Sequence, residues 1–133
     1  MANIDALENL RRVAEGCLRN NDTLNMGTFW SNCGTFGCLA GWAAQDPWFQ
    51  AQGLEVMSAT PAGNRVGVVV WWRRKGGVPY ALRDFEALEE FFGLDTFQAN
   101  YLFADNPHAT NVETIKDWHD AIARINEVIR GEV

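Results

Sequence analysis

The cysteines and histidines are the residues of this chain best suited to covalent chemistry. Cys33 and Gly34 stand just ahead of an alanine-rich run that begins at Leu39 and favours a helix. A thiolate at a helix N-terminus with a histidine beside it is the nucleophile of cysteine hydrolases. Cys33 with His108 as its base is therefore one candidate pair, and His119 is the other histidine available.

The spacing of these residues departs from that of the papain-like enzymes. Their Cys-Gly-Ser-Cys-Trp signature has its second cysteine three residues after the first, whereas Cys38 follows Cys33 by five residues. His119 stands one residue from the apolar stripe of a charged helix, as a surface histidine does. A small cysteine-dependent hydrolase using Cys33 and His108 therefore remains the alternative interpretation.

A run of aromatic and basic residues predicts a binding surface. Residues 71–75 read Trp-Trp-Arg-Arg-Lys and supply ring faces and cations of the kind that hold a nucleotide or an exposed base. A turn at residues 34–37 would add backbone N–H groups at a helix N-terminus, where anions bind. The predicted ligand-binding residues are Gly34, Thr35, Trp71, Trp72, Arg73, Arg74 and Lys75.

Carboxylates predict a second surface for a different partner. Residues 1–79 carry a net charge of +1 and residues 80–133 carry −7. Such an acidic half repels nucleic acid, so no DNA binding is expected, but it is compatible with a basic protein surface. The predicted partner-binding residues lie on one helix and are Asp84, Glu86, Glu89 and Glu90.

The remaining motifs argue against metal and cofactor sites. The pairs Cys33-x4-Cys38 and His108-x10-His119 match no zinc-ligand spacing. No Walker loop is present, and the glycines lack the GxGxxG spacing after a strand that a dinucleotide requires. We therefore expect no metal and no cofactor.

Helices in the first half of the chain follow from apolar periodicity and capping residues. Apolar residues three and four apart predict a helix from Ile4 to about Asn20. Thr35 is expected to cap a helix over residues 39–45, in which Gly41 allows a backbone or an aromatic ring to pack closely. Asp46 and Pro47 are the cap and first residue of a short helix that follows.

Three further helices are expected in the second half. The first begins at Ala81 and stops at Gly93. Thr96 is expected to cap the next, and Thr110-x-x-Glu113 is a capping box for the last.

Residues 54–58 and 65–74 are rich in β-branched and aromatic residues and predict a β-hairpin. Alternation places Trp72 on one face and Trp71 with Arg73 on the other, so either both faces are covered or one Trp meets solvent beside the basic residues. Together these elements predict an α+β fold of about five helices around a small antiparallel hairpin.

Composition favours one soluble domain. The chain has 133 residues, 47% of them hydrophobic, and no apolar run of the roughly 20 residues that span a bilayer. Its N-terminus has no basic or apolar region of a signal peptide, and its three cysteines are an odd number, typical of free thiols. We expect no membrane association and a cytoplasmic location.

Two motifs resemble those of a family of small phage, prophage and bacterial proteins that has no established activity. The pattern C-G-T-x-x-C-x-A-G-W-A runs from Cys33 to Ala43, and G-L-x-x-x-Q-A-x-x-L-F runs from Gly93 to Phe103. Members often carry His at the second variable position, where this chain has Gly37. The resemblance implies a phage-type accessory protein and implies nothing about catalysis.

We therefore expect a non-enzymatic binding protein, acting in a bacterial host cell against host defence. Its partner would be a host protein or a small nucleotide-like signal. Each cluster also has a plainer explanation, because Trp residues often fill cores and basic residues at strand ends are usually solvated.

Overall fold

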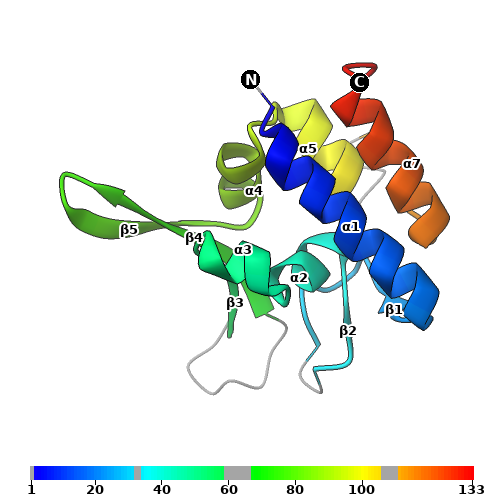
Figure 1. Ribbon diagram of the computed structural model, residues 1–133, viewed down its shortest axis with the longest axis horizontal. Coiled ribbons are helices and arrows are strands. Elements are labelled where there is room, and N and C mark those ends of the chain that lie inside the picture. Colours follow the sequence, from blue (N-terminus) through cyan, green and yellow to red (C-terminus); the bar gives the residue numbers. More distant parts are fainter. Residues whose placement is uncertain (1, 32–33, 59–66, 106–110) are drawn as a thin grey trace.

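The computed structural model describes residues 2–31, 34–58, 67–105 and 111–133. In this part of the chain the structure has six helices and five strands: α1 (Ile4–Asn20), β1 (Thr23–Leu24), β2 (Phe36–Gly37), α2 (Leu39–Ala44), α3 (Pro47–Ala51), β3 (Leu54–Ser58), β4 (Gly67–Lys75), β5 (Val78–Arg83), α4 (Asp84–Phe92), α5 (Thr96–Phe103) and α7 (Trp118–Ile129) (Figure 1). Strands β3, β4 and β5 form an antiparallel sheet in that order, and β1 pairs with β2 in parallel. The predicted α+β class is confirmed. Of the helices in the described ranges, none has the length and apolar character needed to cross a membrane.

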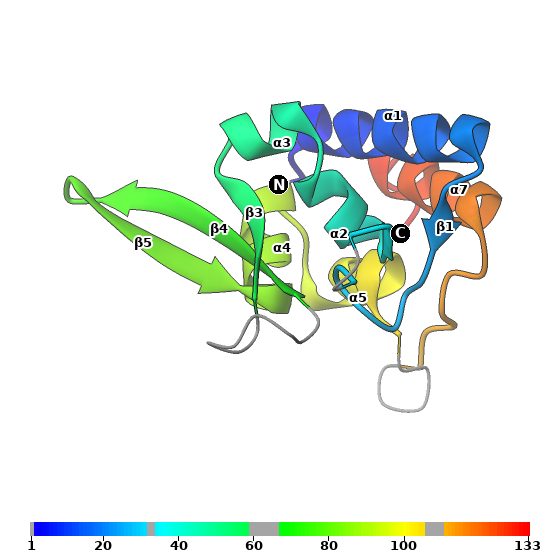
Figure 2. The same cartoon turned by 90° about the horizontal axis from the view of Figure 1, so that it is seen from below.

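Helix α1 has the bounds that its apolar spacing predicts. Leu7, Leu10 and Ala14 lie on its buried face, and the Asn3 side chain accepts a hydrogen bond from the first turn. Asn21 ends the helix in the left-handed conformation with φ 60°. Helix α1 packs along α7, and Figures 1 and 2 show the two side by side.

Helix α2 is fixed by an unusually close approach of another backbone. A Cβ atom on Gly41 would overlap the carbonyl group of Phe29, and one on Gly37 would lie 2.6 Å from Cε3 of Trp30. Trp42, on α2, meets the Trp30 ring edge to face with the centroids 4.9 Å apart. The prediction that Gly41 admits a backbone or an aromatic ring is confirmed.

The start of α2 differs from the prediction. Cys38, and not Thr35, is the N-cap residue, and its side chain makes no capping hydrogen bond. The amides of Thr35 and Phe36 instead donate to Oγ of Ser31, each at 3.2 Å, which closes the turn ahead of β2. Gly34 has φ 74° in this turn, as a glycine is expected to. Thr35 is separated from the helix by Phe36 and Gly37, which form β2 and pair with β1, and by Cys38.

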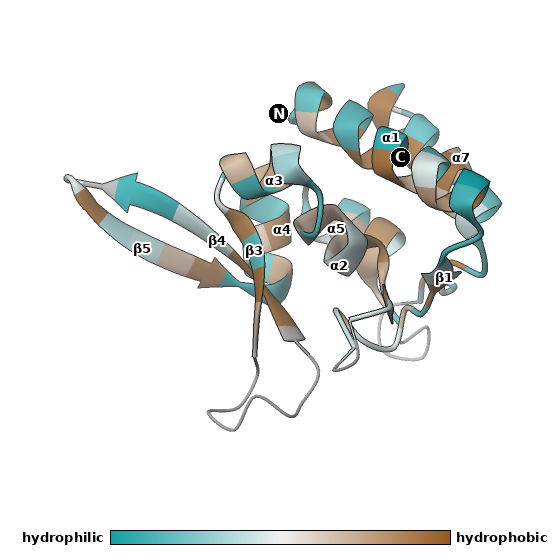
Figure 3. Ribbon diagram, turned by 60° about the horizontal axis from the view of Figure 1, so that its bottom comes forward, coloured by the Kyte–Doolittle hydropathy of each residue, from teal (hydrophilic) through white to brown (hydrophobic). Residues whose placement is uncertain are grey.

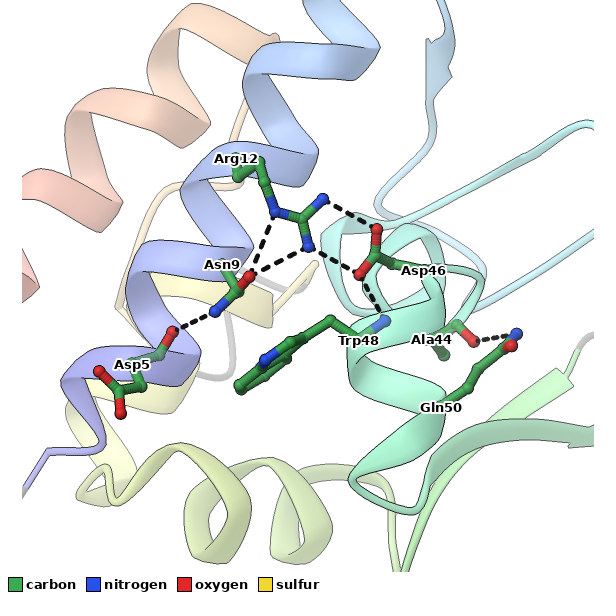
Figure 4. A network of polar contacts seen from close by, with 7 residues as sticks. All are labelled: Asp5, Asn9, Arg12, Ala44, Asp46, Trp48 and Gln50. Carbon is green, nitrogen blue, oxygen red and sulfur yellow. Dashed lines mark hydrogen bonds and ion pairs between the residues drawn. The ribbon is translucent and has the colours of Figure 1, made fainter.

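A polar network joins α1 to the start of α3 (Figure 4). Arg12 donates to both carboxylate oxygens of Asp46, at 3.0 and 2.7 Å, and also to Asn9. Asp46 caps α3 by accepting from the Trp48 amide at 3.0 Å, as its sequence position predicts. The hydrogen bonds from Arg12 hold the pKa of Asp46 below its ordinary value. One carboxylate thus fixes the start of α3 and its distance from α1.

The predicted hairpin is part of a three-stranded sheet. Residues 78–83 pair with β4, whereas the sequence predicts a helix that begins at Ala81. Ala81 lies opposite Trp72 in the ladder, so its backbone is committed to the sheet and α4 begins only at Asp84. Gly76 and Gly77 connect the strands with φ 62° and 84°, the two left-handed residues of a tight hairpin turn.

The caps of α5 and α7 also differ from the prediction. Asp95, and not Thr96, caps α5 through a capping box with Gln98. Helix α7 begins at Trp118 with Asp117 as its cap, well after Thr110-x-x-Glu113, of which Thr110 lies outside the described residues.

A buried arginine explains the late start of α7. Arg124 donates to the carbonyl oxygen of Glu113 at 2.7 Å and to that of Tyr101 at 2.8 Å. The Glu113 carbonyl is therefore bonded to a side chain and not to a helical amide. Val112 and Ile115 are buried, but on a segment that is not helical.

Replacing Gly41 by alanine tests the close approach at α2. We expect Gly41→Ala to lower the free energy of unfolding by about 1 to 3 kcal/mol, because the new methyl group would displace the Phe29 backbone. Gly16→Ala is the matched control on α1, since a Cβ there meets only the end of the flexible Arg19 side chain at 3.8 Å. That variant should keep or gain stability, by up to about 1 kcal/mol. Equal unfolding midpoints in urea for both variants would contradict the proposed contact.

Candidate functional site

The outer half of the β4–β5 hairpin projects from the body of the protein (Figures 1 and 2). Strand β3 pairs with β4 only from Gly67 to Trp71, whereas β5 continues to Lys75. Trp71 forms the last pair with β3, and the rest of the predicted aromatic and basic run, residues 72–75, lies on this projecting part. Because side chains alternate along a strand, the run is divided between two faces. We call the face that includes Trp71 and Arg73 the inner face, and the face that includes Trp72 and Arg74 the outer face.

Trp71 anchors the inner face to the protein. Its ring meets Phe91 of α4 edge to face, with centroids 5.4 Å apart, and its Nε1 donates to the carbonyl of Gln52 at 3.1 Å. Leu54, opposite Trp71 in the ladder, is fully buried. Trp71 therefore contributes to packing and does not offer a free ring face.

Arg73 is held on the inner face by two rings and a carboxylate. Its guanidinium lies 5.3 Å from the centroid of Trp71 and 4.8 Å from that of Tyr80. Its Nη1 is 3.4 Å from Oε2 of Glu90 on α4. The basic run and the acidic helix, which the sequence assigns to opposite kinds of partner, are thus joined within the chain.

The outer face presents two large apolar side chains. Trp72 and Met57 are each 39% exposed, and Val70 lies buried between their positions on the same face. The Trp72 Nε1 donates to Oε1 of Glu55 at 2.7 Å, which fixes the ring on the sheet surface. The structure thus has Trp72 exposed to solvent and Trp71 partly buried against the core, which is the second of the two predicted arrangements. Figure 3 shows apolar residues along β3 and the nearby part of β4.

Cations border this apolar strip. The ladder places Arg83 opposite Val70, and Arg74 lies on the same face nearer the hairpin tip. Both side chains are exposed, and Arg74 donates to the carbonyl of Gly77 at 2.9 Å. The outer face is therefore apolar at its centre and basic at one border.

Gly34 and Thr35 do not join the aromatic and basic run. In the turn ahead of β2, the Gly34 amide donates to the Ser31 carbonyl at 3.0 Å, and the Thr35 amide donates to Oγ of Ser31 at 3.2 Å. Figure 1 shows β2 well separated from the projecting hairpin. The structure therefore divides the predicted ligand set into the turn, the inner face and the outer face; the Lys75 side chain lies outside what is described.

The predicted acidic surface is partly used by the chain itself. Glu90 pairs with Arg73, and Glu89 accepts from the Thr96 hydroxyl at 3.3 Å. Asp84 has φ 54° and a buried Oδ1 that has no partner in the described structure, and burial raises its pKa. Glu86 is exposed.

Cys33 and His108, the residues of the alternative hydrolase, lie outside the described residues. Cys17 and Cys38 are buried free thiols. Burial raises the pKa of Cys17 to about 12 and that of Cys38 to about 11. Near neutral pH both are protonated and poor nucleophiles. His119 is exposed on α7, as its sequence position predicts.

Sequence reasoning missed three members of the outer face: Glu55, Met57 and Arg83. The alternation of residues 54–58 places Glu55 and Met57 on one face, but only the strand register shows that this face is shared with Trp72. Arg83 was expected within a helix. A side chain at position 37, such as the His of the proteins that the Cys33 to Ala43 motif resembles, would not fit this backbone, because its Cβ would overlap the Phe29 carbonyl. No protein-family model, curated protein or solved structure matches this chain.

Alanine at the two adjacent tryptophans tests the assignment of the faces. Trp71→Ala should cost about 3 kcal/mol of stability, because it empties a site packed against Phe91. Trp72→Ala should cost only about 1 kcal/mol, mainly from the lost hydrogen bond to Glu55. Urea unfolding of both variants measures the difference. A larger loss for Trp72→Ala would mean that the two faces are assigned the wrong way round.

The buried Cys38 thiol predicts a loss of stability at high pH. Its ordinary pKa of 9.0 rises to about 11 in the folded protein, so folding favours the neutral thiol. This contribution is complete below pH 9 and declines as the pH rises to 11, by on the order of 2 kcal/mol. Unfolding in urea at pH 8 to 11 should show a steeper decline for the wild type than for Cys38→Ala. Parallel curves would show that the thiol is not buried in its neutral form.

Proposed function

We propose that this chain is a non-enzymatic binding protein that holds a protein partner on the outer face of its three-stranded sheet. The observation that carries the proposal is the exposure of Trp72 beside Met57, both 39% exposed on one sheet face. Trp is among the residues that contribute most to protein interfaces when a partner covers them.

The setting of Trp72 favours binding. Its ring is held by the hydrogen bond to Glu55, so covering it costs little side-chain entropy and leaves its N–H group paired. The neighbouring Trp71 fixes the same strand to α4. A fixed ring on a fixed strand is suited to rigid docking.

The contacts of the arginines favour a protein over a nucleotide. Arg73 already pairs with Glu90, and the Trp71 ring packs against Phe91. A phosphate would have to compete with the Glu90 carboxylate for Arg73. Arg74 and Trp72 remain available to solvent, as one cation and one ring.

Charge on the outer face indicates the chemistry of the partner. Arg74 and Arg83 are both exposed at the border of the apolar strip. A partner segment that places an apolar side chain on Trp72 and carboxylates beside it is complementary to this surface. The acidic helix α4 packs on the inner face, so a basic partner would meet the protein from another side.

The resemblance to phage and prophage proteins supports an accessory role within this proposal. The motif residues from Cys33 to Ala43 include the close-packed Gly41, which fits a role in folding. We accordingly propose that the partner is a host protein, and that capturing it antagonises host defence.

The Trp72→Ala variant tests the proposal in a partner-capture experiment. Proteins retained from host lysate by the wild type are identified, purified and titrated calorimetrically against each variant. We expect Trp72→Ala to weaken the complex by about 2 kcal/mol or more, roughly 30-fold. Arg74→Glu should slow association most at low salt.

Phe97→Ala is the matched control, because Phe97 is another exposed aromatic residue, 56% exposed, on α5. It should leave the affinity unchanged. Equal losses for Phe97→Ala and Trp72→Ala, or capture that is indifferent to Trp72, would overturn the proposal. Saturable binding of a nucleotide that depends on Arg74 and Trp72 would support the nucleotide alternative.

A further inference from the structure

A small cavity that shares no residue with the outer face lies where four distant parts of the chain meet. Its volume is about 260 Å³. Phe29 comes from the segment ahead of β2, Cys38 from the start of α2, Phe85 from α4 and Phe103 from the end of α5. Phe103 and Cys38 are almost fully buried, at 3% and 1% exposed. These four residues give the cavity an aromatic and apolar wall, in which Cys38 and Phe103 belong to the core and Phe29 and Phe85 are partly buried.

Two oxygen-bearing side chains line the same cavity. Thr28 has a hydroxyl that is buried from solvent and has no hydrogen-bond partner within the described structure. Asp105 is the charged residue among the described residues that line it, and it is exposed. A buried hydroxyl without a partner is costly, and a ligand that donates a hydrogen bond would remove that cost.

Glycine at position 27 gives the carboxylate its place at the cavity. A Cβ atom on Gly27 would lie 3.3 Å from Oδ2 of Asp105 and 3.2 Å from Oδ1 of Asn25. The negative charge of Asp105 also contributes to the raised pKa of Cys38, after the larger effect of burial. Asp105 and Cys38 line the same cavity, so the carboxylate stands at its border.

We propose that this cavity binds a small organic cation, an ammonium group attached to an apolar body. The ammonium group would donate to the Asp105 carboxylate and the Thr28 hydroxyl, while the apolar body lies among Phe29, Phe85 and Phe103. A carboxylate beside aromatic rings is the combination that attracts ammonium groups. The volume lies just below the range of about 300 to 1,000 Å³ typical of drug-sized ligands, so the ligand is small.

The cation has two possible sources, a free amine or a lysine side chain on a protein. Phenethylamine probes the first, and Nα-acetyl-lysine methylamide probes the second. Both are titrated into isotope-labelled protein, and the amide signals of residues 27–29, 38, 85, 103 and 105 are followed by NMR. We expect saturable shifts of these signals with phenethylamine. Tighter binding of the lysine derivative would assign the site to a protein side chain.

Isosteric ligands and matched variants separate the cation from the apolar body. Phenylpropanoate, which reverses the charge, should bind at least tenfold more weakly than phenethylamine. Asp105→Asn should weaken phenethylamine at least tenfold but leave the neutral phenethyl alcohol unchanged, and Thr28→Val should weaken phenethylamine severalfold. Asp5→Asn removes the same charge from the exposed first turn of α1 and should change nothing.

Three results would overturn the proposal: no saturable shift with either amine, equal binding of phenylpropanoate and phenethylamine, or equal effects of Asp105→Asn and Asp5→Asn. Unchanged unfolding midpoints in urea show that the variants are folded. The site is independent of the outer face, so Asp105→Asn should leave Trp72-dependent capture unaltered.

Discussion

The Phe29 carbonyl lies where a side chain on residue 41 would begin, and this close approach to Gly41 is the constraint on which the centre of this protein depends. It brings an irregular segment against a helix at backbone distance, which only glycine permits. Trp42, one residue further along α2, then lies between Trp30 and Trp118, at centroid distances of 4.9 and 6.2 Å. A single backbone approach therefore positions α2 against both the preceding segment and the last helix. Phe29 and Cys38 both line the cavity.

Helix α4 connects the two surfaces to which we assign binding. Phe91 supports the Trp71 ring and so fixes the projecting strand, and Glu90 holds Arg73 beside it. Phe85, near the other end of the helix, lines the cavity. The outer face and the cavity thus share a support but use separate side chains. Ligands at the two sites could each bind without competing for a residue.

Adjacent residues of β4 make different contacts, and this explains how an exposed Trp is held in place. Trp71 and Arg73 are used for packing and internal pairing, so Trp72 and Arg74 can remain in solvent on a strand that is anchored. The inner contacts supply the rigidity, and the outer side chains supply the surface. A strand of uniform apolar character would bury both faces or aggregate through them.

The sequence by itself determined the elements whose signals are local. The spacing of Leu7, Leu10 and Ala14 predicts α1 with its bounds, and Asp46 before Pro47 predicts the cap of α3, because periodicity and capping act within a few residues. Only the tertiary structure decided the rest. Residues 78–83 form a strand because they pair with β4. Helix α7 begins late because the Glu113 carbonyl accepts a hydrogen bond from the Arg124 side chain. Which tryptophan faces solvent depends on where α4 packs, and that contact between distant segments leaves no mark in the local sequence.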